Sequence, residues 1–424
     1  MRFWQLGAAG KPGRRSLAAA AVALWLLGLV SGAGTAAARE IKIGMSAAFS
    51  GPSRALGIEL YRGALAYINY ANQQRLLGED HLVVLARDDG YQPGPAVQNT
   101  IDLVEKHRVF LLFNYVGTPT VTRVLPLLKM FSKSHLFLLF PFTGAEPQRR
   151  LPYRDFVFNL RPSYLQETKG LVENLLRVGR RRIAIFYQAD AYGRSGWVGV
   201  HRTLAAHGLK ILAEATYHRG ARFSDSFQQQ VDILRRSRPD AVISVGAYAA
   251  CAGFIRDARA AGWEVPIANL SFVDSDNLLR LLKKTAGTQL RRYTQGLIVS
   301  QVVPSYQEVS LPAVVQYRRL MDRYQPRIPS ELATEPYRPL RYSFVSMEGF
   351  LNAKMLVKIL SLMKGDLRRE RLRRVIEGVR DYDIGIGVPV NFGPGRHQGL
   401  DRVYYTTVRG GKLVPMRDWR KWRK

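Results

Sequence analysis

Hydrophobic and polar residues alternate along the chain in two ways after residue 40. Short runs rich in β-branched and other apolar residues predict buried strands, and longer stretches with apolar residues three or four positions apart predict amphipathic helices. In the first predicted helix, Leu56, Leu60, Ala64 and Ile68 share one face. The predicted strands cover residues 41–45, 82–86, 109–113, 136–140, 156–160, 183–187, 211–215, 241–245, 266–270, 296–301, 388–392 and 403–408. Regular alternation of strands and helices is typical of a parallel sheet covered by helices.

The alternation occurs twice, which predicts two α/β lobes. A second series begins after residue 162, where Ser163 and Gln166 have the spacing of a capping box. The two series have similar lengths and rhythms, so we expect two doubly wound lobes. The last third of the chain adds predicted helices at residues 313–324, 341–363 and 367–379, and a proline-rich loop at residues 325–340. A loop of this length inside a compact domain is more often functional than part of the scaffold.

The first 38 residues have the three parts of a secretory signal peptide. A start with four basic residues precedes an apolar run at residues 17–30, and the small residues 31–38 end in Ala-Ala-Ala. The alternative is a membrane anchor, but the apolar run has about 14 residues and a spanning helix needs roughly 20. We therefore predict export to the periplasm and cleavage before Arg39. No cysteine lies near this point, so we expect no lipid anchor.

The chain is strongly basic, with 63 Lys and Arg, 33 Asp and Glu and a formal net charge of +30. The predicted signal peptide holds four of the positive charges, which leaves +26 for the mature chain. The densest basic groups lie at residues 180–182, 368–374 and 417–424, and none interleaves aromatic residues on a strand as RNA-binding sheets do. We therefore predict no nucleic-acid partner and expect a basic surface that attracts anionic membrane headgroups or anionic solutes.

Sequence signatures of catalysis are absent. The chain has no P-loop, no Gly-x-Ser-x-Gly and no His-Glu-x-x-His, and its seven histidines are scattered. The single cysteine, Cys251, excludes an intrachain disulfide, and its alanine-rich surroundings favour a buried filler over a nucleophile. We predict that the protein is not an enzyme and holds no cofactor or metal. An exported hydrolase with Ser50 or Ser195 as nucleophile is a remote alternative, since no base is evident.

Loops rich in small residues follow the predicted strands in a characteristic order. They cover residues 44–52, 88–90, 115–120 and 141–145 in the first lobe and residues 187–193 in the second. In this order they resemble the loops of type 1 periplasmic solute-binding proteins of the leucine/isoleucine/valine-binding family, which serve ABC importers. The resemblance runs from about residue 41 to about residue 401. Each motif alone is weak, but the ordered set is specific.

The resemblance implies that a small-molecule ligand binds at the strand ends. In open α/β sheets, ligands bind outside the carboxyl ends of strands, and a helix N-terminus favours an anionic group. By the family's pattern, Thr118, Thr120 and Thr143 hold the ligand carboxylate, although each threonine is equally suited to cap its own helix. Tyr192 and Tyr248 fall on positions where the family's tyrosines contact the ligand. The candidate ligand-binding residues are Ser50, Gly117, Thr118, Thr120, Phe142, Thr143, Tyr192, Tyr248 and Ser271.

Two features depart from the branched-chain amino-acid binders. Leu56 stands where those proteins have a tyrosine, and no acid at residues 270–272 aligns with the glutamate that neutralises the amino group. Asp274 and Asp276 lie a few residues further on, and they either replace that acid or cap the next helix. A buried ammonium without a partner is costly. A ligand without an α-amino group, such as an amide, a short-chain acid or an aromatic acid, is therefore a candidate beside an amino acid.

The resemblance also implies an architecture and a role. It predicts two Rossmann-like lobes joined by a hinge of three crossings near residues 160–163, 299–304 and 383–388. We expect lobe 1 to span residues 39–160 and 305–382, and lobe 2 to span residues 161–304 and 383–424. The implied function is to capture an amino acid, amide or organic acid between closing lobes and to deliver it to ABC permease subunits in the inner membrane. The alternative is a ligand-sensing periplasmic protein of the same fold that reports to a membrane receptor.

Overall fold

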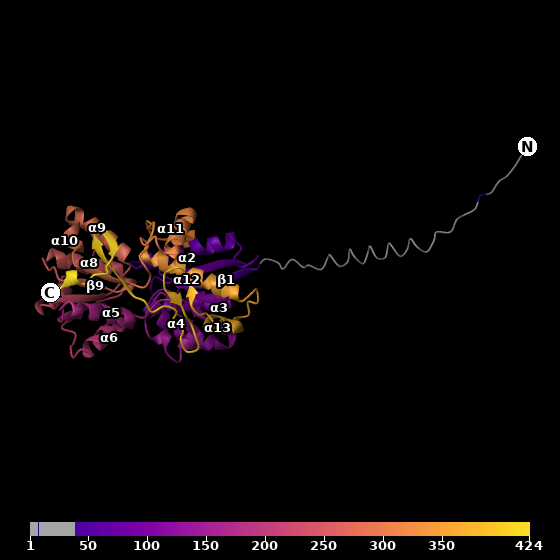
Figure 1. Ribbon diagram of the computed structural model, residues 1–424, viewed down its shortest axis with the longest axis horizontal. Helices are drawn as coiled ribbons and strands as arrows, with labels where there is room; N and C mark the ends of the chain where they lie inside the picture. Colours follow the sequence, from indigo (N-terminus) through magenta and orange to yellow (C-terminus); the bar gives the residue numbers. More distant parts are fainter. Residues whose placement is uncertain (1–6, 8–38) are drawn as a thin grey trace, which may run out of the picture. The chain divides into compact units, whose positions relative to one another are not determined.

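Two β-sheets flanked by helices organise the chain (Figure 1). The computed structural model describes Gly7 and residues 39–424, so the predicted signal peptide lies outside the described residues apart from Gly7. In the first sheet, five parallel strands follow the order β2-β1-β3-β4-β5. Their bounds are Glu40–Ala47 (β1), His81–Asp88 (β2), Leu111–Phe113 (β3), Leu138–Leu139 (β4) and Val157–Phe158 (β5).

The second sheet has seven strands in the order β14-β13-β10-β9-β8-β6-β7, with β13 and β14 antiparallel to their neighbours. The bounds are Ile183–Gln188 (β6), Glu214–Tyr217 (β7), Ala241–Val245 (β8), Ile267–Asn269 (β9), Leu297–Gln301 (β10), Tyr404–Arg409 (β13) and Lys412–Pro415 (β14). A separate small sheet pairs Tyr382–Asp383 (β11) with Pro389–Val390 (β12). Strands β7-β6-β8-β9-β10 repeat the order of the first sheet, which confirms the prediction of two doubly wound α/β halves.

Helices cover both faces of each sheet. Their bounds are Arg54–Gln73 (α2), Pro93–Glu105 (α3), Thr118–Met130 (α4), Tyr164–Arg177 (α5), Ala191–Ala205 (α6), Gln228–Arg236 (α7), Tyr248–Ala260 (α8), Ser275–Ala286 (α9), Leu290–Thr294 (α10), Pro312–Tyr324 (α11), Phe344–Leu362 (α12) and Leu372–Glu377 (α13). In β3, Leu111 and Phe113 join the apolar cluster of α2, α11 and α12, whereas Leu112 joins that of α3 and α4. Because alternate strand residues face opposite sides, these clusters lie on opposite faces of the first sheet. In the second half, α5 packs on α6, and α8 packs on α7 and α9.

Local signals in the sequence explain most of these bounds. The Ser163 hydroxyl accepts a hydrogen bond from the Gln166 N–H, and the Gln166 side chain accepts one from the Ser163 N–H, which confirms the predicted capping box. The strand predicted at residues 211–215 begins later, at Glu214, where its pairing with β6 starts. The helix predicted at residues 367–379 is shorter, because a 3-10 turn precedes α13. Strand β14 was not predicted.

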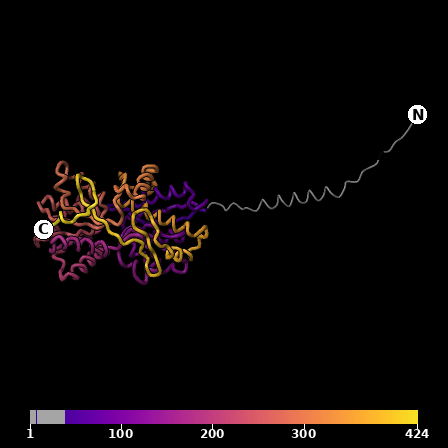
Figure 2. Tube along the Cα trace, viewed as in Figure 1, coloured from indigo at the N-terminus to yellow at the C-terminus, as the bar shows by residue number. Residues whose placement is uncertain are grey.

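Three segments connect the halves, and the first and third of them run side by side. Residues 159–163 lead from β5 to α5, and residues 302–311 lead from β10 to α11. The C-terminal segment returns to the second sheet (Figure 2), and its Gly399 N–H donates a hydrogen bond to the Asn159 carbonyl at 2.8 Å. The apolar side chains of residues 384–400 pack in the cluster around α11 and α12 of the first half. The C-terminal chain therefore leaves the first half only after Leu400.

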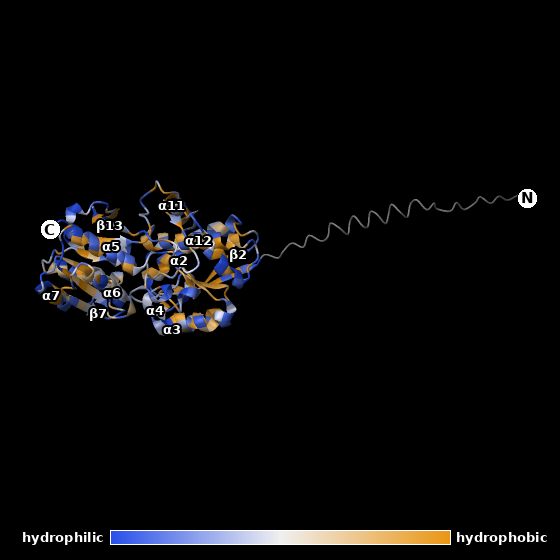
Figure 3. Ribbon diagram, turned by 60° about the horizontal axis from the view of Figure 1, so that its bottom comes forward, coloured by the Kyte–Doolittle hydropathy of each residue, from blue (hydrophilic) through white to orange (hydrophobic). Residues whose placement is uncertain are grey.

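Hydrophobic residues gather on strands such as β2, whereas helices such as α7 are largely hydrophilic (Figure 3). Within the described residues, we find no helix that is both long and apolar enough to cross a membrane.

Candidate functional site

Aromatic rings from both halves meet where the strands of the two sheets end. Phe272, in a 3-10 turn after β9, is fully buried at the centre of these rings. Its ring centroid lies 4.7 Å from that of Tyr192, 5.3 Å from that of Phe142 and 5.9 Å from that of Tyr91. Tyr164 completes this ring cluster, with its centroid 5.1 Å from that of Tyr192. Tyr91 and Phe142 come from the first half and the other three from the second, so the ring cluster joins the halves.

Gly117 allows Tyr91 to lie directly against the loop between β3 and α4. The backbone of Gly117 has φ 100° and ψ 147°, a conformation that essentially only glycine adopts. A Cβ atom at this position would lie 2.8 Å from Cδ2 of Tyr91 and closer still to Cε2. The Tyr91 hydroxyl in turn accepts a hydrogen bond of 3.3 Å from Gln188 of the second half. Gly117 therefore contacts the ring cluster through Tyr91.

The hydroxyls of the three candidate threonines have different hydrogen-bond partners. The hydroxyls of Thr118 and Thr143 are buried and hydrogen-bonded to each other at 2.7 Å. The Thr120 hydroxyl instead donates to the Gly117 carbonyl at 2.9 Å and to the Val116 carbonyl, so it binds its own helix start. Among the described residues, no side-chain hydrogen bond caps the N-terminus of α4, which begins after Gly117. The structure thus brings Thr118 and Thr143 together and directs Thr120 away from them.

A groove of about 220 Å³ lies beside the ring cluster and is lined by both halves. Three helices begin at this interlobe groove: α4 at Thr118, α5 at Tyr164 and α6 at Ala191. Arg194 adds a positive charge, and Glu146 is the one carboxylate among its lining residues. The remaining lining is largely apolar and includes Gly144, Ala145, Pro147, Leu165 and Val198. Because helix N-termini carry partial positive charge, the groove suits an anionic group on an apolar body.

The two candidate tyrosines of the second half both lie at helix starts. Tyr192 is fully buried, and its hydroxyl has no hydrogen-bond partner among the described residues. Burial raises the pKa of Tyr192 well above its ordinary value, so this hydroxyl stays protonated and able to donate. The Tyr248 hydroxyl accepts a hydrogen bond of 3.4 Å from the Ala55 N–H at the start of α2. The Tyr192 hydroxyl is therefore available to donate a hydrogen bond, whereas the Tyr248 hydroxyl links the second half to the first through Ala55.

Ser50 and Ser271 have other partners. The Ser50 N–H donates to the Asp88 carboxylate at 3.2 Å, at the ends of the neighbouring strands β1 and β2. The Ser271 hydroxyl donates to Glu167 at 2.9 Å and accepts from the Arg161 guanidinium. The Ser271 side chain is therefore held by Arg161 and Glu167, and the Ser50 main chain by the Asp88 carboxylate.

Arg161, Glu167 and Glu348 form a buried ion cluster at the first crossing. The Arg161 guanidinium lies 3.3 Å from Glu167 on α5 and 3.3 Å from Glu348 on α12. It also lies over the Phe142 ring, 4.9 Å from the centroid. Burial raises the pKa of Glu348 to about 7, against the opposing effect of Arg161. The ion cluster links helices of the two halves and supports one wall of the ring cluster.

The two acids considered as partners for a ligand ammonium are occupied by the protein. The Asp274 carboxylate accepts hydrogen bonds from the N–H and the side-chain amide of Asn277, so it caps α9. Burial raises the pKa of Asp274 to about 8. Asp276 accepts from the Tyr306 hydroxyl at 2.7 Å and from the Phe344 N–H at 2.9 Å. Helix capping is therefore the role that the structure gives Asp274, and Asp276 anchors the start of α12.

Sequence reasoning did not select Tyr91, Arg161, Tyr164, Phe272 or Glu348. Tyr91 and Phe272 each follow a predicted strand closely, and that position was a signal. Glu348 is the one acid in α12, whose neighbouring residues are mostly apolar, and such an acid indicates a buried charge that needs a partner. Arg161 lies within the predicted crossing and Tyr164 directly follows it, and neither residue carried a signal of its own.

Comparison with known proteins places the chain in a family. The model of a family described as periplasmic binding protein matches residues 40–412. No curated protein sequence matches this chain. One similar solved structure is that of a possible leucine/isoleucine/valine-binding protein from Rhodopirellula baltica SH 1. It is 30% identical to this chain with a TM-score of 0.79, and the match covers 92% of this chain and 100% of that chain.

Two further solved structures have the same fold. A substrate-binding periplasmic protein from Ralstonia solanacearum is 27% identical, with a TM-score of 0.77, and the match covers 89% of this chain and 100% of that one. A branched chain amino acid ABC transporter protein from Thermus thermophilus with bound valine is 17% identical, with a TM-score of 0.77, 91% of this chain covered and 98% of that chain. The chain described here belongs to the periplasmic binding protein family.

Proposed function

We propose that the protein captures a small organic carboxylate between its two halves and delivers it to an ABC importer. One observation carries this proposal: the N-termini of α4, α5 and α6 converge on one interlobe groove with mostly apolar walls. An anionic group gains from the partial positive charge of these helix ends. The apolar lining and the ring cluster bury the body of the ligand, as is usual for small-molecule sites.

Specific groups are assigned to the carboxylate. The uncapped N-terminus of α4 and the hydroxyl pair of Thr118 and Thr143 hold its oxygens. The Tyr192 hydroxyl donates to the ligand. A buried hydroxyl without a partner costs about 1–3 kcal/mol, so a ligand that accepts from Tyr192 gains part of this energy. Gly117 and Phe142 shape the site, and Ser50, Thr120, Tyr248 and Ser271 support it through the contacts described above.

The absence of an acid for an ammonium group favours a ligand without an α-amino group. Asp274 and Asp276 are engaged by protein donors, and Glu146, the one carboxylate that lines the groove, is already paired with Arg150 at 3.1 Å. An aliphatic or aromatic carboxylate needs no such partner, whereas an amino acid would bury its ammonium at a large cost. A branched-chain amino acid, the ligand class named for the Rhodopirellula protein, is the competing candidate.

Capture requires that the halves move as lobes. In this proposal the hinge consists of the crossings at residues 159–163, 302–311 and 400–403. Lobe 1 spans residues 39–160 and 305–382, and it also takes residues 384–400, because their apolar side chains pack in its cluster. Lobe 2 holds residues 161–304 and the C-terminal segment. A ligand that contacts both lobes stabilises the closed state by its differential affinity for that state.

Export and the downstream partner are also part of the proposal. The three-part N-terminal segment and membership of a periplasmic family support residence in the periplasm, where permease subunits of the inner membrane would receive the ligand. A sensor that presents the same closed state to a membrane receptor is the alternative. Capture of membrane partners from solubilised membranes, with and without ligand, separates the two, because a transporter and a receptor differ in the subunits recovered.

Titration of two tyrosine variants tests the site. A screen of isovalerate, benzoate and 3-phenylpropanoate first selects the carboxylate that binds best to the native protein. Tyr192→Phe removes a donor that the protein itself does not use, so it should lower affinity about tenfold without lowering the stability of the ligand-free protein. Tyr115→Phe is the matched control, since its buried hydroxyl bonds Thr100 within the apolar cluster of α3 and α4.

The control should show the opposite pattern, with lower stability and unchanged affinity. Thr118→Ala should weaken binding in the same titration. The site assignment fails if Tyr192→Phe and Thr118→Ala both bind the selected carboxylate as tightly as the native protein does.

A further inference from the structure

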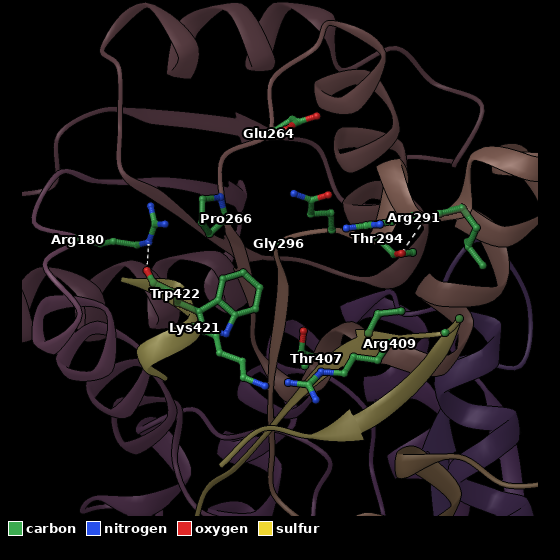
Figure 4. A pocket seen from close by; sticks show the side chains of 15 residues that line it. Arg180, Glu264, Pro266, Arg291, Thr294, Gly296, Thr407, Arg409, Lys421 and Trp422 are labelled. Atoms are coloured by element: carbon green, nitrogen blue, oxygen red, sulfur yellow. Dashed lines mark hydrogen bonds between the residues drawn. The ribbon is translucent and has the colours of Figure 1, made fainter. Parts of the chain in front are cut away.

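A second, larger cavity lies on the outer end of the second half. It has a volume of about 850 Å³ and is formed by the start of α10, the turn between β13 and β14, and the C-terminal residues (Figure 4). Pro266 precedes β9 and Gly296 precedes β10, so the cavity lies at the N-terminal ends of these strands. Phe272 of the ring cluster follows the opposite end of β9. The cavity, which we call the outer pocket, is therefore separate from the interlobe groove.

Positive charge dominates the outer pocket. Four basic side chains line it, those of Arg180, Arg291, Arg409 and Lys421, and Glu264 is the single carboxylate among the lining residues. None of Arg291, Arg409 and Lys421 forms a salt bridge within the described part of the chain. In Figure 4 the charged ends of Arg409 and Lys421 point toward one another. Two like charges facing each other without a counter-ion indicate a place for an anion.

A buried guanidinium lies directly behind the wall of the outer pocket. Arg259 is almost fully buried, and its guanidinium donates to the carbonyls of Val265 and Gln295 but to no carboxylate. A Cβ atom placed on the lining residue Gly296 would lie 3.5 Å from Nη2 of Arg259. Burial lowers the pKa of Arg259 to about 10, which leaves it charged at neutral pH. Its charge therefore adds to that of the lining side chains.

We propose that the outer pocket binds a phosphate group, either of a soluble phosphorylated molecule or of an anionic lipid headgroup. A phosphate offers several strong acceptor oxygens to groups approaching from different sides, and guanidinium groups match it with paired hydrogen bonds. Arg291 comes from α10, Arg409 from the end of β13 and Lys421 from the C-terminal turn, so one phosphate is approached from three elements.

The aromatic lining fits the same ligand. The Trp422 ring is half-buried at the pocket and presents an apolar surface beside the basic groups. Its main-chain carbonyl is held by the Arg180 side chain at 2.7 Å, which fixes the C-terminal turn against the second sheet. Tryptophan beside basic residues suits the boundary between phosphate headgroups and the apolar part of a lipid or phosphorylated molecule.

Binding of two phosphate probes to purified protein tests this inference. The probes are glycerol 1-phosphate, followed by calorimetry, and vesicles of phosphatidylglycerol with phosphatidylcholine, followed by co-sedimentation. The variant R291Q/R409Q/K421Q should lower binding at least tenfold, roughly the effect of removing basic residues from an anionic interface. The control R123Q/K129Q/R202Q removes the same charge from exposed positions on α4 and α6 and should change binding little.

The two probes distinguish the sources of the phosphate, and either source supports the proposal. Binding of glycerol 1-phosphate that depends on the pocket residues indicates a soluble ligand, and pocket-dependent binding to vesicles alone indicates a headgroup. Equal losses in the two triple variants would overturn the proposal, because net charge alone would then explain binding. Absence of binding to both probes, or equally tight binding of a glutamate-rich peptide, would also overturn it.

Discussion

Replacement of Gly117 by alanine tests how closely the site is packed. The backbone conformation of Gly117 costs any other residue about 1–3 kcal/mol. The new Cβ atom would also overlap the Tyr91 ring, whose Cδ2 atom lies 2.8 Å from the ideal Cβ position. Overpacking of this kind costs a further 1–3 kcal/mol or so. Gly117→Ala should therefore lower the free energy of unfolding by about 2–6 kcal/mol.

Gly51→Ala is the matched control. Gly51 has φ 73° on a neighbouring loop, and nothing lies within 4 Å of its ideal Cβ position. The control should cost about 1–2 kcal/mol from backbone strain alone. Urea unfolding measures the free energy of unfolding of both variants. When Tyr91→Ala has removed the ring, Gly117→Ala should cost only the backbone strain, because the overlap with Tyr91 is gone. The reasoning is refuted if Gly117→Ala is no more destabilising than Gly51→Ala, or if Tyr91→Ala does not reduce its effect.

Three further predictions concern buried groups. Arg161→Gln leaves buried carboxylates without their cation and should cost about 3–5 kcal/mol in urea unfolding, whereas Arg341→Gln at an exposed ion pair should change stability little. Because burial raises the pKa of Glu348 from about 4.5 to about 7, the folded state favours its neutral form, and the stability that this proton contributes is complete below about pH 4.5 and is lost as the pH rises through 7. Glu348→Gln should flatten this part of the loss in thermal unfolding, whereas Asp89, Asp276 and Asp274, whose pKa values burial raises to about 7, 6 and 8, should keep the rest. Burial raises the pKa of Cys251 to about 12, so its thiol should resist Ellman's reagent at pH 8 until the protein is unfolded, and rapid reaction of the native protein would contradict this burial.

Most of the strands were predictable because each carries its own signal along the chain. Short apolar runs separated by amphipathic helices indicate parallel sheets, and both patterns are visible in the spacing of nearby residues alone. Strand β14 was missed because it has only four residues, of which two are buried or half-buried. The Gly410-Gly411 pair before it has positive φ at both positions and was a hairpin signal.

The candidate site was predictable only in part. Thr118, Thr143 and Tyr192 follow strand ends, and strand ends of one sheet lie at one edge, so their grouping within each half follows from topology. The position of Phe272 between Tyr91 and Tyr192 depends on how the halves face each other, which no local pattern encodes. The same holds for Arg161 and Glu348, which are far apart in sequence and meet only across the interface of the halves.

The most direct test of the proposed function compares ligands with one carbon skeleton. Thermal unfolding of the native protein is measured with 3-phenylpropanoate, 3-phenylpropanamide and phenylalanine, and with isovalerate, isovaleramide and valine, at equal concentrations. The account predicts that at least one carboxylate raises the unfolding temperature and that its amide and its α-amino acid counterpart do so much less. Equal or greater stabilisation by phenylalanine or valine would contradict it, because the site would then accommodate an ammonium group.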